Sequence, residues 1–97
     1  MAEMKIIKTA LAGTLESSDV YVEVVPRDTI QIEIESIVAA QFEQAISQAV
    51  RQTVQALGVT GAGIVLKDRG ALDCVIRARV ETALRRGAAA NVAATEA

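Results

Sequence analysis

Two alternating segments stand out in this chain of 97 residues: Val20-Tyr21-Val22-Glu23-Val24-Val25 and Ile30-Gln31-Ile32-Glu33-Ile34-Glu35. In both, β-branched residues occupy the even positions, and in the second segment polar residues take every odd position. This period of two is typical of strands that bury one face and expose the other. The intervening Pro26-Arg27-Asp28-Thr29 predicts a hairpin turn that joins the two strands.

Outside this pair, the pattern predicts one earlier strand, one later strand and two helices. After Ser36 the apolar residues recur with helical spacing, which predicts a helix over residues 38–57 that ends at Gly58. A strand is expected over 7–14 and another over 64–66, followed by a turn at 67–70 and a helix over 71–86. The predicted fold is α+β, a two-layer sandwich of order β-β-β-α-β-α. Its small, mostly antiparallel sheet carries both helices on one face.

The length leaves room for one small domain, which we expect to cover residues 1–86. Gly87 and the alanine-rich residues after it have no side chains that could anchor them. Residues 87–97 are therefore predicted to form a flexible tail.

The composition excludes several classes of function. With no histidine and a single cysteine, the chain cannot build a Ser-His-Asp or Cys-His nucleophile or a usual zinc site, so no catalytic or metal residue is expected. Two per cent aromatic residues and a net charge of −2 argue against a nucleic-acid partner. No apolar run is long enough for a membrane span, and no signal peptide is recognised. One cysteine permits no internal disulfide, which favours the cytoplasm.

The polar loop Glu16-Ser17-Ser18-Asp19 lies between two predicted strands. Serines between acidic residues usually form a solvated turn with local hydrogen bonds. The chain encodes no base that could activate them, but another enzyme could modify an exposed hydroxyl at this position. Both interpretations are consistent with the residues.

Arg79 occupies an unusual position in the second predicted helix. At 100° per residue it falls within the apolar face that contains Leu72, Ile76 and Ala83. A guanidinium on such a face must reach water or find a partner. Two contacts are therefore open: an ion pair with a carboxylate of the sheet, or a contact that braces the 16–19 loop or phosphate groups near it.

Two motifs resemble those of a known family. Thr9-Ala10-Leu11-Ala12-Gly13-Thr14-Leu15-Glu16-Ser17-Ser18-Asp19-Val20 resembles the N-terminal signature of the citrate lyase acyl carrier proteins, the γ subunits of citrate lyase. Lys67-Asp68-Arg69-Gly70-Ala71-Leu72-Asp73-Cys74-Val75-Ile76-Arg77-Ala78-Arg79 resembles the second signature of the same family. The similarity covers roughly residues 5–86. Ser18 is a departure from the pattern, because the family varies among small residues there, and it places two serines side by side.

The resemblance implies a carrier subunit that is not catalytic alone. The serine after the Thr-Leu-Glu run, here Ser17, would carry 2'-(5''-phosphoribosyl)-3'-dephospho-CoA through a phosphodiester, with Ser18 as the other possible attachment point. The thiol of this group would hold acetyl and citryl thioesters while citrate is cleaved to acetate and oxaloacetate. Glu16, Asp19 and Arg79 are expected to support the attachment loop.

The implied partners are the α subunit of citrate lyase, an acyl transferase, and the β subunit, a citryl lyase, together with the transferase that installs the group. Two alternatives remain at this level. One is a carrier subunit of the malonate decarboxylase type, against which the Gly-Ala-Leu-Asp-Cys run argues. The other is a non-enzymatic α+β interaction module with an unmodified serine loop.

Overall fold

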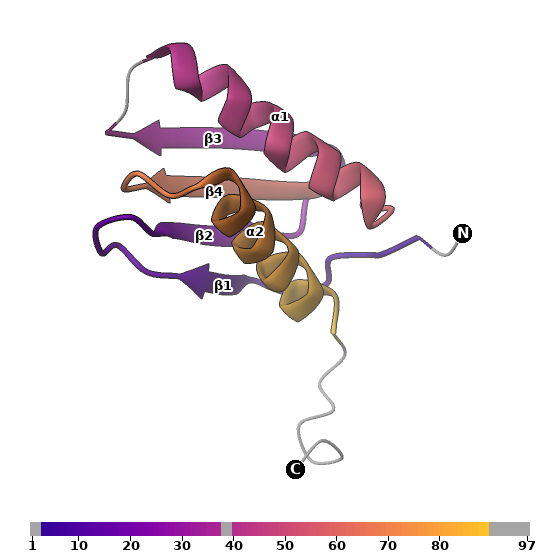
Figure 1. Cartoon of the computed structure of the whole chain (residues 1–97). Helices are drawn as coiled ribbons and strands as arrows, with labels where there is room; N and C mark the ends of the chain where they lie inside the picture. Colours follow the sequence, from indigo (N-terminus) through magenta and orange to yellow (C-terminus); the bar gives the residue numbers. More distant parts are fainter. Residues whose placement is uncertain (1–2, 38–39, 90–97) are drawn as a thin grey trace.

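The computed structural model describes residues 3–37 and 40–89. In chain order its elements are β1 (Ala10–Gly13), β2 (Val20–Val25), β3 (Ile30–Ser36), α1 (Ala40–Ala56), β4 (Ala62–Asp68) and α2 (Asp73–Ala88). The four strands form one sheet, and both helices cover the same face of it (Figure 1). The predicted α+β class, element order and two-layer architecture are confirmed. Neither helix in these ranges is long and apolar enough to cross a membrane.

The structure gives the strand order, which the sequence pattern left open. The sheet runs β1-β2-β4-β3, with antiparallel pairing between β1 and β2 and between β2 and β4, and parallel pairing between β3 and β4. The sheet is thus mixed and mostly antiparallel, as expected. The predicted hairpin at residues 26–29 is wrong, because β4 lies between β2 and β3 (Figure 1).

Residues 26–29 pass across the beginning of β4 instead of turning back beside β2. The amide of Ala62 donates to the carbonyl of Thr29 over 3.0 Å. A Cβ on Gly61 would lie 2.2 Å from the carbonyl oxygen of Arg27, so only glycine leaves room for this crossing. Five of the seven β4 residues are buried and the other two are half-buried, which fits a strand with neighbours on both sides.

The core lies between the sheet and the two helices. On β2, Val20, Val22 and Val24 are fully buried, and they pack in one cluster with Leu66 of β4 and Leu84 of α2. Burial of a side chain of this size stabilises a fold by about 1.5–3 kcal/mol. The two central strands are therefore the most firmly held part of the sheet, and the loop that follows β1 is attached to their end.

The end of α2 extends two residues beyond the predicted boundary. Gly87 is buried, and its carbonyl accepts hydrogen bonds from the amides of Ile7 and Lys8 at 2.9 and 3.2 Å. The backbone thus anchors a residue that has no side chain to do so. The rest of the predicted tail, from residue 90 on, lies outside the described residues, as does the predicted start of the first helix at residue 38.

Three segments lie at one end of the sheet: residues 14–19 after β1, residues 69–72 after β4, and the last residues of β3 (Figure 1, left). The register brings them together, because Asp68 at the end of β4 pairs with Val20 on one side and with Ser36 on the other. The predicted turn at 67–70 therefore begins two residues later, since Lys67 and Asp68 still belong to β4.

Candidate functional site

Ser17 and Ser18 form the corner of a β-turn over residues 16–19. The amide of Asp19 donates to the carbonyl of Glu16 over 3.1 Å, which closes the turn. Ser18 has a φ of 65°, and a positive φ at the third position is the mark of a type II turn. Ser17 takes the second position, and both serines are exposed. The turn thus presents two neighbouring hydroxyl groups to solvent.

The turn is fastened to the end of β4 by two backbone hydrogen bonds. The amide of Ser18 donates to the carbonyl of Arg69 over 2.8 Å, and the amide of Arg69 donates to the carbonyl of Asp19 over 2.9 Å. These bonds continue the pairing of β2 with β4 beyond its last strand residues. Ser17 therefore projects from a rigid frame, the arrangement that a precisely positioned attachment point needs.

Asp19 holds the loop together from its inner side. Its Oδ2 accepts a hydrogen bond from the Thr14 hydroxyl at 2.7 Å, and its Oδ1 accepts one from the amide of Val20 at 2.7 Å. Arg79 donates two more hydrogen bonds to this carboxylate, from Nε to Oδ1 at 3.1 Å and from Nη2 to Oδ2 at 3.0 Å. These contacts, the Thr14 hydrogen bond foremost and Arg79 next, lower the pKa of Asp19 from 3.8 to about 2. The carboxylate is therefore ionised at neutral pH.

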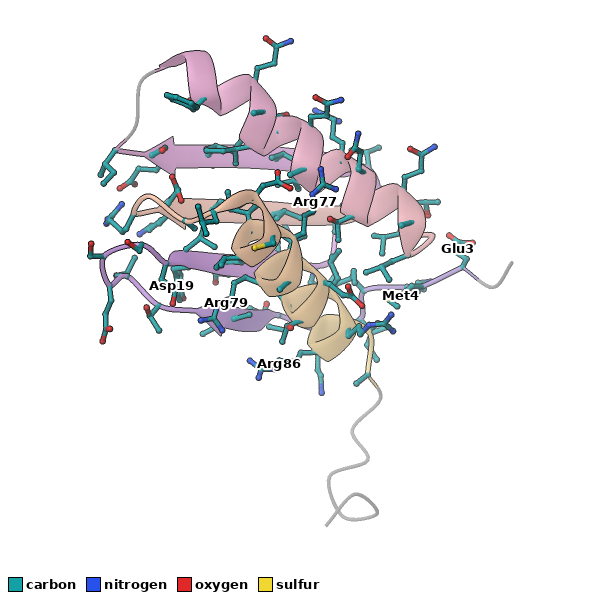
Figure 2. The ribbon with its side chains drawn as sticks, viewed as in Figure 1. Glu3, Met4, Asp19, Arg77, Arg79 and Arg86 are labelled. Atoms are coloured by element: carbon teal, nitrogen blue, oxygen red, sulfur yellow. The ribbon has the colours of Figure 1, made fainter. Side chains whose placement is uncertain are left out.

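Arg79 reaches from α2 to the loop that precedes β2, where Figure 2 shows it beside Asp19. Its stem runs past Gly13, because a Cβ on Gly13 would lie 3.3 Å from Cδ of Arg79. The side chain stays 41% exposed while that of Asp19 is 15% exposed. Of the two contacts considered for Arg79, the structure shows one to the loop, since Asp19 precedes β2 and belongs to no strand.

Glu16 contributes to the turn through its backbone. Its amide donates to the Thr14 hydroxyl over 3.1 Å, and its carbonyl closes the turn. In the described part of the chain its exposed carboxylate forms no hydrogen bond or ion pair. The structure therefore brings Asp19 and Arg79 together and leaves the Glu16 side chain outside that contact.

Asp68 is a residue of this site that the sequence alone did not single out. It is 1% exposed, and its Oδ2 accepts a hydrogen bond from the Ser36 hydroxyl at 2.8 Å while its Oδ1 accepts one from the amide of Ala71 at 2.9 Å. It thus ties the end of β3 and the approach to α2 to the end of β4. The sequence does contain one indication of its role, because Asp68 follows Ile64 and Leu66 at alternate positions of β4 and so falls on the buried face.

The site is suited to hold a group that is attached to serine, and it lacks a base that would activate the serine hydroxyl. In the described residues the Ser17 hydroxyl makes no hydrogen bond, and the Asp19 carboxylate is engaged by three partners. The cation of Arg79 borders the turn through its pair with Asp19 and remains 41% exposed, whereas the guanidinium of Arg69 lies toward β3, 3.5 Å from Glu35. A phosphodiester on the serine adds one negative charge, which fits this setting. No cluster of metal-ligating side chains occurs within residues 3–37 and 40–89.

Known proteins resemble this chain over most of its length. The family described as "ACP: Malonate decarboxylase delta subunit (MdcD)" matches residues 7–87. A citrate lyase acyl carrier protein of Haemophilus influenzae (strain PittEE) is 55% identical over 83 residues, which cover 86% of this chain and 87% of that protein. One of Klebsiella pneumoniae is 57% identical over 88 residues, 89% of each chain.

Among solved structures, a chain in the crystal structure of a Pseudomonas malonate decarboxylase hetero-tetramer in complex with malonate superposes with a TM-score of 0.66. The match covers 88% of this chain and 89% of that one, at 20% sequence identity. At this level of identity the likeness concerns the fold alone.

Proposed function

Because the chain belongs to the citrate lyase acyl carrier protein family, we propose that Ser17 is the residue to which its prosthetic group is attached. The chain is an acyl carrier subunit, which holds a covalently attached group and is not catalytic alone. The observation that carries the proposal is the 16–19 turn, which exposes the Ser17 hydroxyl while backbone hydrogen bonds hold the next residue to β4.

Ser17 suits this role better than Ser18. The Ser18 amide is committed to the carbonyl of Arg69, and its φ of 65° is a conformation that serine adopts only at a cost. If an attaching enzyme drew Ser18 into its active site, this frame would have to open. Ser17 can be reached with the frame intact.

We further propose that the group is 2'-(5''-phosphoribosyl)-3'-dephospho-CoA, joined to Ser17 through a phosphodiester. When bound, this group supplies a thiol for acetyl and citryl thioesters. The contribution of the chain is to position the hydroxyl and to place the Arg79 cation near the phosphodiester. Arg79 is partly exposed, and its N–H groups that do not bind Asp19 can donate hydrogen bonds to phosphate oxygens.

The proposed partners are the α and β subunits of citrate lyase and the transferase that attaches the group. A tether benefits such a complex because the acyl group meets both active sites at a high effective concentration and does not diffuse away. The proposal includes a cytoplasmic location, which the single cysteine, unable to form an internal disulfide, fits.

A carrier subunit of the malonate decarboxylase type is the second candidate. The description of the matching family and the fold of the Pseudomonas chain favour it. The citrate lyase carriers are favoured by their much higher identity, 55–57% against 20%. Affinity purification from the native host separates the two candidates, because each predicts a different set of co-purifying subunits.

The attachment is tested by the intact mass of the chain purified from its own host during growth on citrate. We expect the wild type and Ser18→Ala to carry an adduct of coenzyme A size, and Ser17→Ala to lack it. Circular dichroism of each variant shows whether the fold is retained. An unmodified wild-type chain from cells that are cleaving citrate contradicts the proposal, and an adduct lost only in Ser18→Ala moves the attachment to the neighbouring serine.

A further inference from the structure

A groove lies between the first turns of α1 and α2, at the same end of the sheet as the serine turn. It has a volume of about 270 Å³ and is lined mainly by apolar groups, among them Phe42, Ala45, Ile46, Ala71 and Ile76. The buried carboxylate of Asp68 and the exposed one of Asp73 also border it. None of the contacts that attach the serine turn uses this space.

Large apolar side chains are left in solvent around this groove. Phe42, the only phenylalanine of the chain, lines the groove and is 51% exposed. Leu72, next to the groove residue Ala71, is 70% exposed and precedes α2 without a side-chain cap. Exposed apolar residues around a hollow mark a place where an apolar group binds.

The groove and the serine turn share one hydrogen-bonded frame. Ser18 is bound to the carbonyl of Arg69, and the next two residues of the chain, Gly70 and Ala71, line the groove. The amide of Ala71 is in turn held by Asp68. A flexible group attached to Ser17 therefore starts from a turn that is joined, through Ser18 and Arg69, to the segment that forms one wall of the groove.

We propose that this groove holds the acyl end of the prosthetic arm when the arm carries a small neutral acyl group such as acetyl. The inference rests on the proposed attachment at Ser17. The volume is slightly below the 300–1,000 Å³ of pockets that enclose drug-sized ligands, so it fits the end of the arm and not its whole length. The groove shields the thioester carbonyl from water and releases it when a partner subunit offers a better site.

Charge makes the groove selective among acyl groups. Its lining contains the carboxylates of Asp68 and Asp73 and no basic side chain. Since Asp73 forms an ion pair with Arg77 at 2.6 Å, the negative charge of the lining comes mainly from the buried Asp68. An acyl group that carries carboxylates would lose its hydration there and meet charges of its own sign. The acetyl form is thus held and a carboxylate-bearing form stays in solution.

The test uses the full chain with the arm attached, in a Cys74→Ser background, because Cys74 is an exposed thiol that would react beside the arm. The arm is prepared as free thiol, acetyl thioester and succinyl thioester. NMR spectra of the Phe42 ring and of the Ile46 and Ile76 methyl groups are then compared. We expect these signals to shift with acetyl and to match the free-thiol spectrum with succinyl.

The rate of acetyl thioester cleavage by hydroxylamine gives a second readout. A groove occupied nine-tenths of the time slows this reaction about tenfold. Ala45→Leu fills the groove from α1 and should abolish both the protection and the NMR shifts. Ala56→Leu is the matched control, because Ala56 is an exposed alanine of the same helix outside the groove. Phe42→Ala, which removes part of the lining, should also weaken the protection.

Equal cleavage rates in wild type and Ala45→Leu, or an acetyl form whose Phe42 signals do not move, overturn the inference. Absence of the arm from the purified chain, seen by intact mass, overturns the proposed attachment instead. The two failures are therefore distinguishable.

Discussion

Arg79 of α2 and Asp19 of the serine loop, which lie 60 positions apart in the chain, form a two-point ion pair with N–O distances of 3.0 and 3.1 Å. This contact joins a helix on the covered face of the sheet to the turn at its end. Since Asp19 also binds Thr14 and the amide of Val20, one carboxylate connects the helix, the loop and the first residue of β2. The order of the serine turn therefore depends on α2.

Replacement of Arg79 by methionine keeps the apolar stem and removes the charge. We expect the free energy of unfolding to fall by about 1–3 kcal/mol, because hydrogen bonds to a charged, largely buried carboxylate are lost. Hydrogen exchange at the amides of residues 18–19 should accelerate. Arg85→Met serves as the control, since it breaks an exposed i,i+4 pair with Glu81 and should cost less than about 0.5 kcal/mol in urea unfolding. Equal losses in the two variants contradict this role of Arg79.

Acid should weaken the same loop. The pKa of Asp19 is about 2 in the folded chain against an ordinary value of 3.8. Between these two pH values the unfolded chain therefore binds more protons than the folded chain. The contribution of Asp19 to stability is therefore complete above about pH 4 and is lost as the pH falls toward 2. Urea unfolding of wild type and Asp19→Asn at pH 7 and at pH 3 should show that the difference between their free energies of unfolding is smaller at pH 3. If this difference did not change with pH, the ionised Asp19 carboxylate would not be the group that stabilises the loop.

Gly13 and Gly70 both have a positive φ, 85° and 92°, but their surroundings differ. A Cβ on Gly13 would lie 1.8 Å from the carbonyl oxygen of Val20, whereas a Cβ on Gly70 would meet nothing within 4 Å. Gly70→Ala should cost about 1–2 kcal/mol, the conformational penalty alone. Gly13→Ala should cost clearly more, because the end of β1 must move away from the beginning of β2. The melting temperatures of the two variants check this order, and equal values would refute it.

Removal of the Asp68 carboxylate should loosen the segment that leads into α2. Asp68→Ala takes away the acceptor for the Ser36 hydroxyl and for the Ala71 amide in a buried setting, which we expect to cost about 2–3 kcal/mol. Asp73→Ala, at an exposed position five residues on, should change stability by less than about 0.5 kcal/mol. The Ala71 amide should exchange faster in Asp68→Ala only. Unchanged exchange would show that the carboxylate does not hold this segment.

The residue pattern predicted each strand and helix but not the neighbours of each strand. The alternation in 20–25 and 30–35 defines which face of each strand is buried. It does not define the neighbouring strand, because the same face is buried beside any strand that the same helices cover. The place of β4 between them depends on contacts such as Gly61 beneath Arg27, which join residues far apart in sequence. The hairpin prediction failed for this reason.

The candidate site was predictable where its chemistry is local. The serines between acidic residues and the position of Arg79 on an apolar face are visible in the sequence. The roles of Thr14 and Asp68 are not, because each depends on a hydrogen bond whose partner is positioned only by the folded turn or by the sheet register. Gly87 is similar, since its anchor is its own carbonyl and not a side chain.

The attachment of the prosthetic group at Ser17 is tested most directly by fragmentation mass spectrometry of the peptide that contains residues 16–19. The chain is purified from its own host during growth on citrate, and the fragments are read on both sides of each serine. We predict that the added mass, of coenzyme A size, lies on Ser17 and that Ser18 is unmodified. The same mass on Ser18, or a peptide without any added mass from cells that are cleaving citrate, would contradict the account.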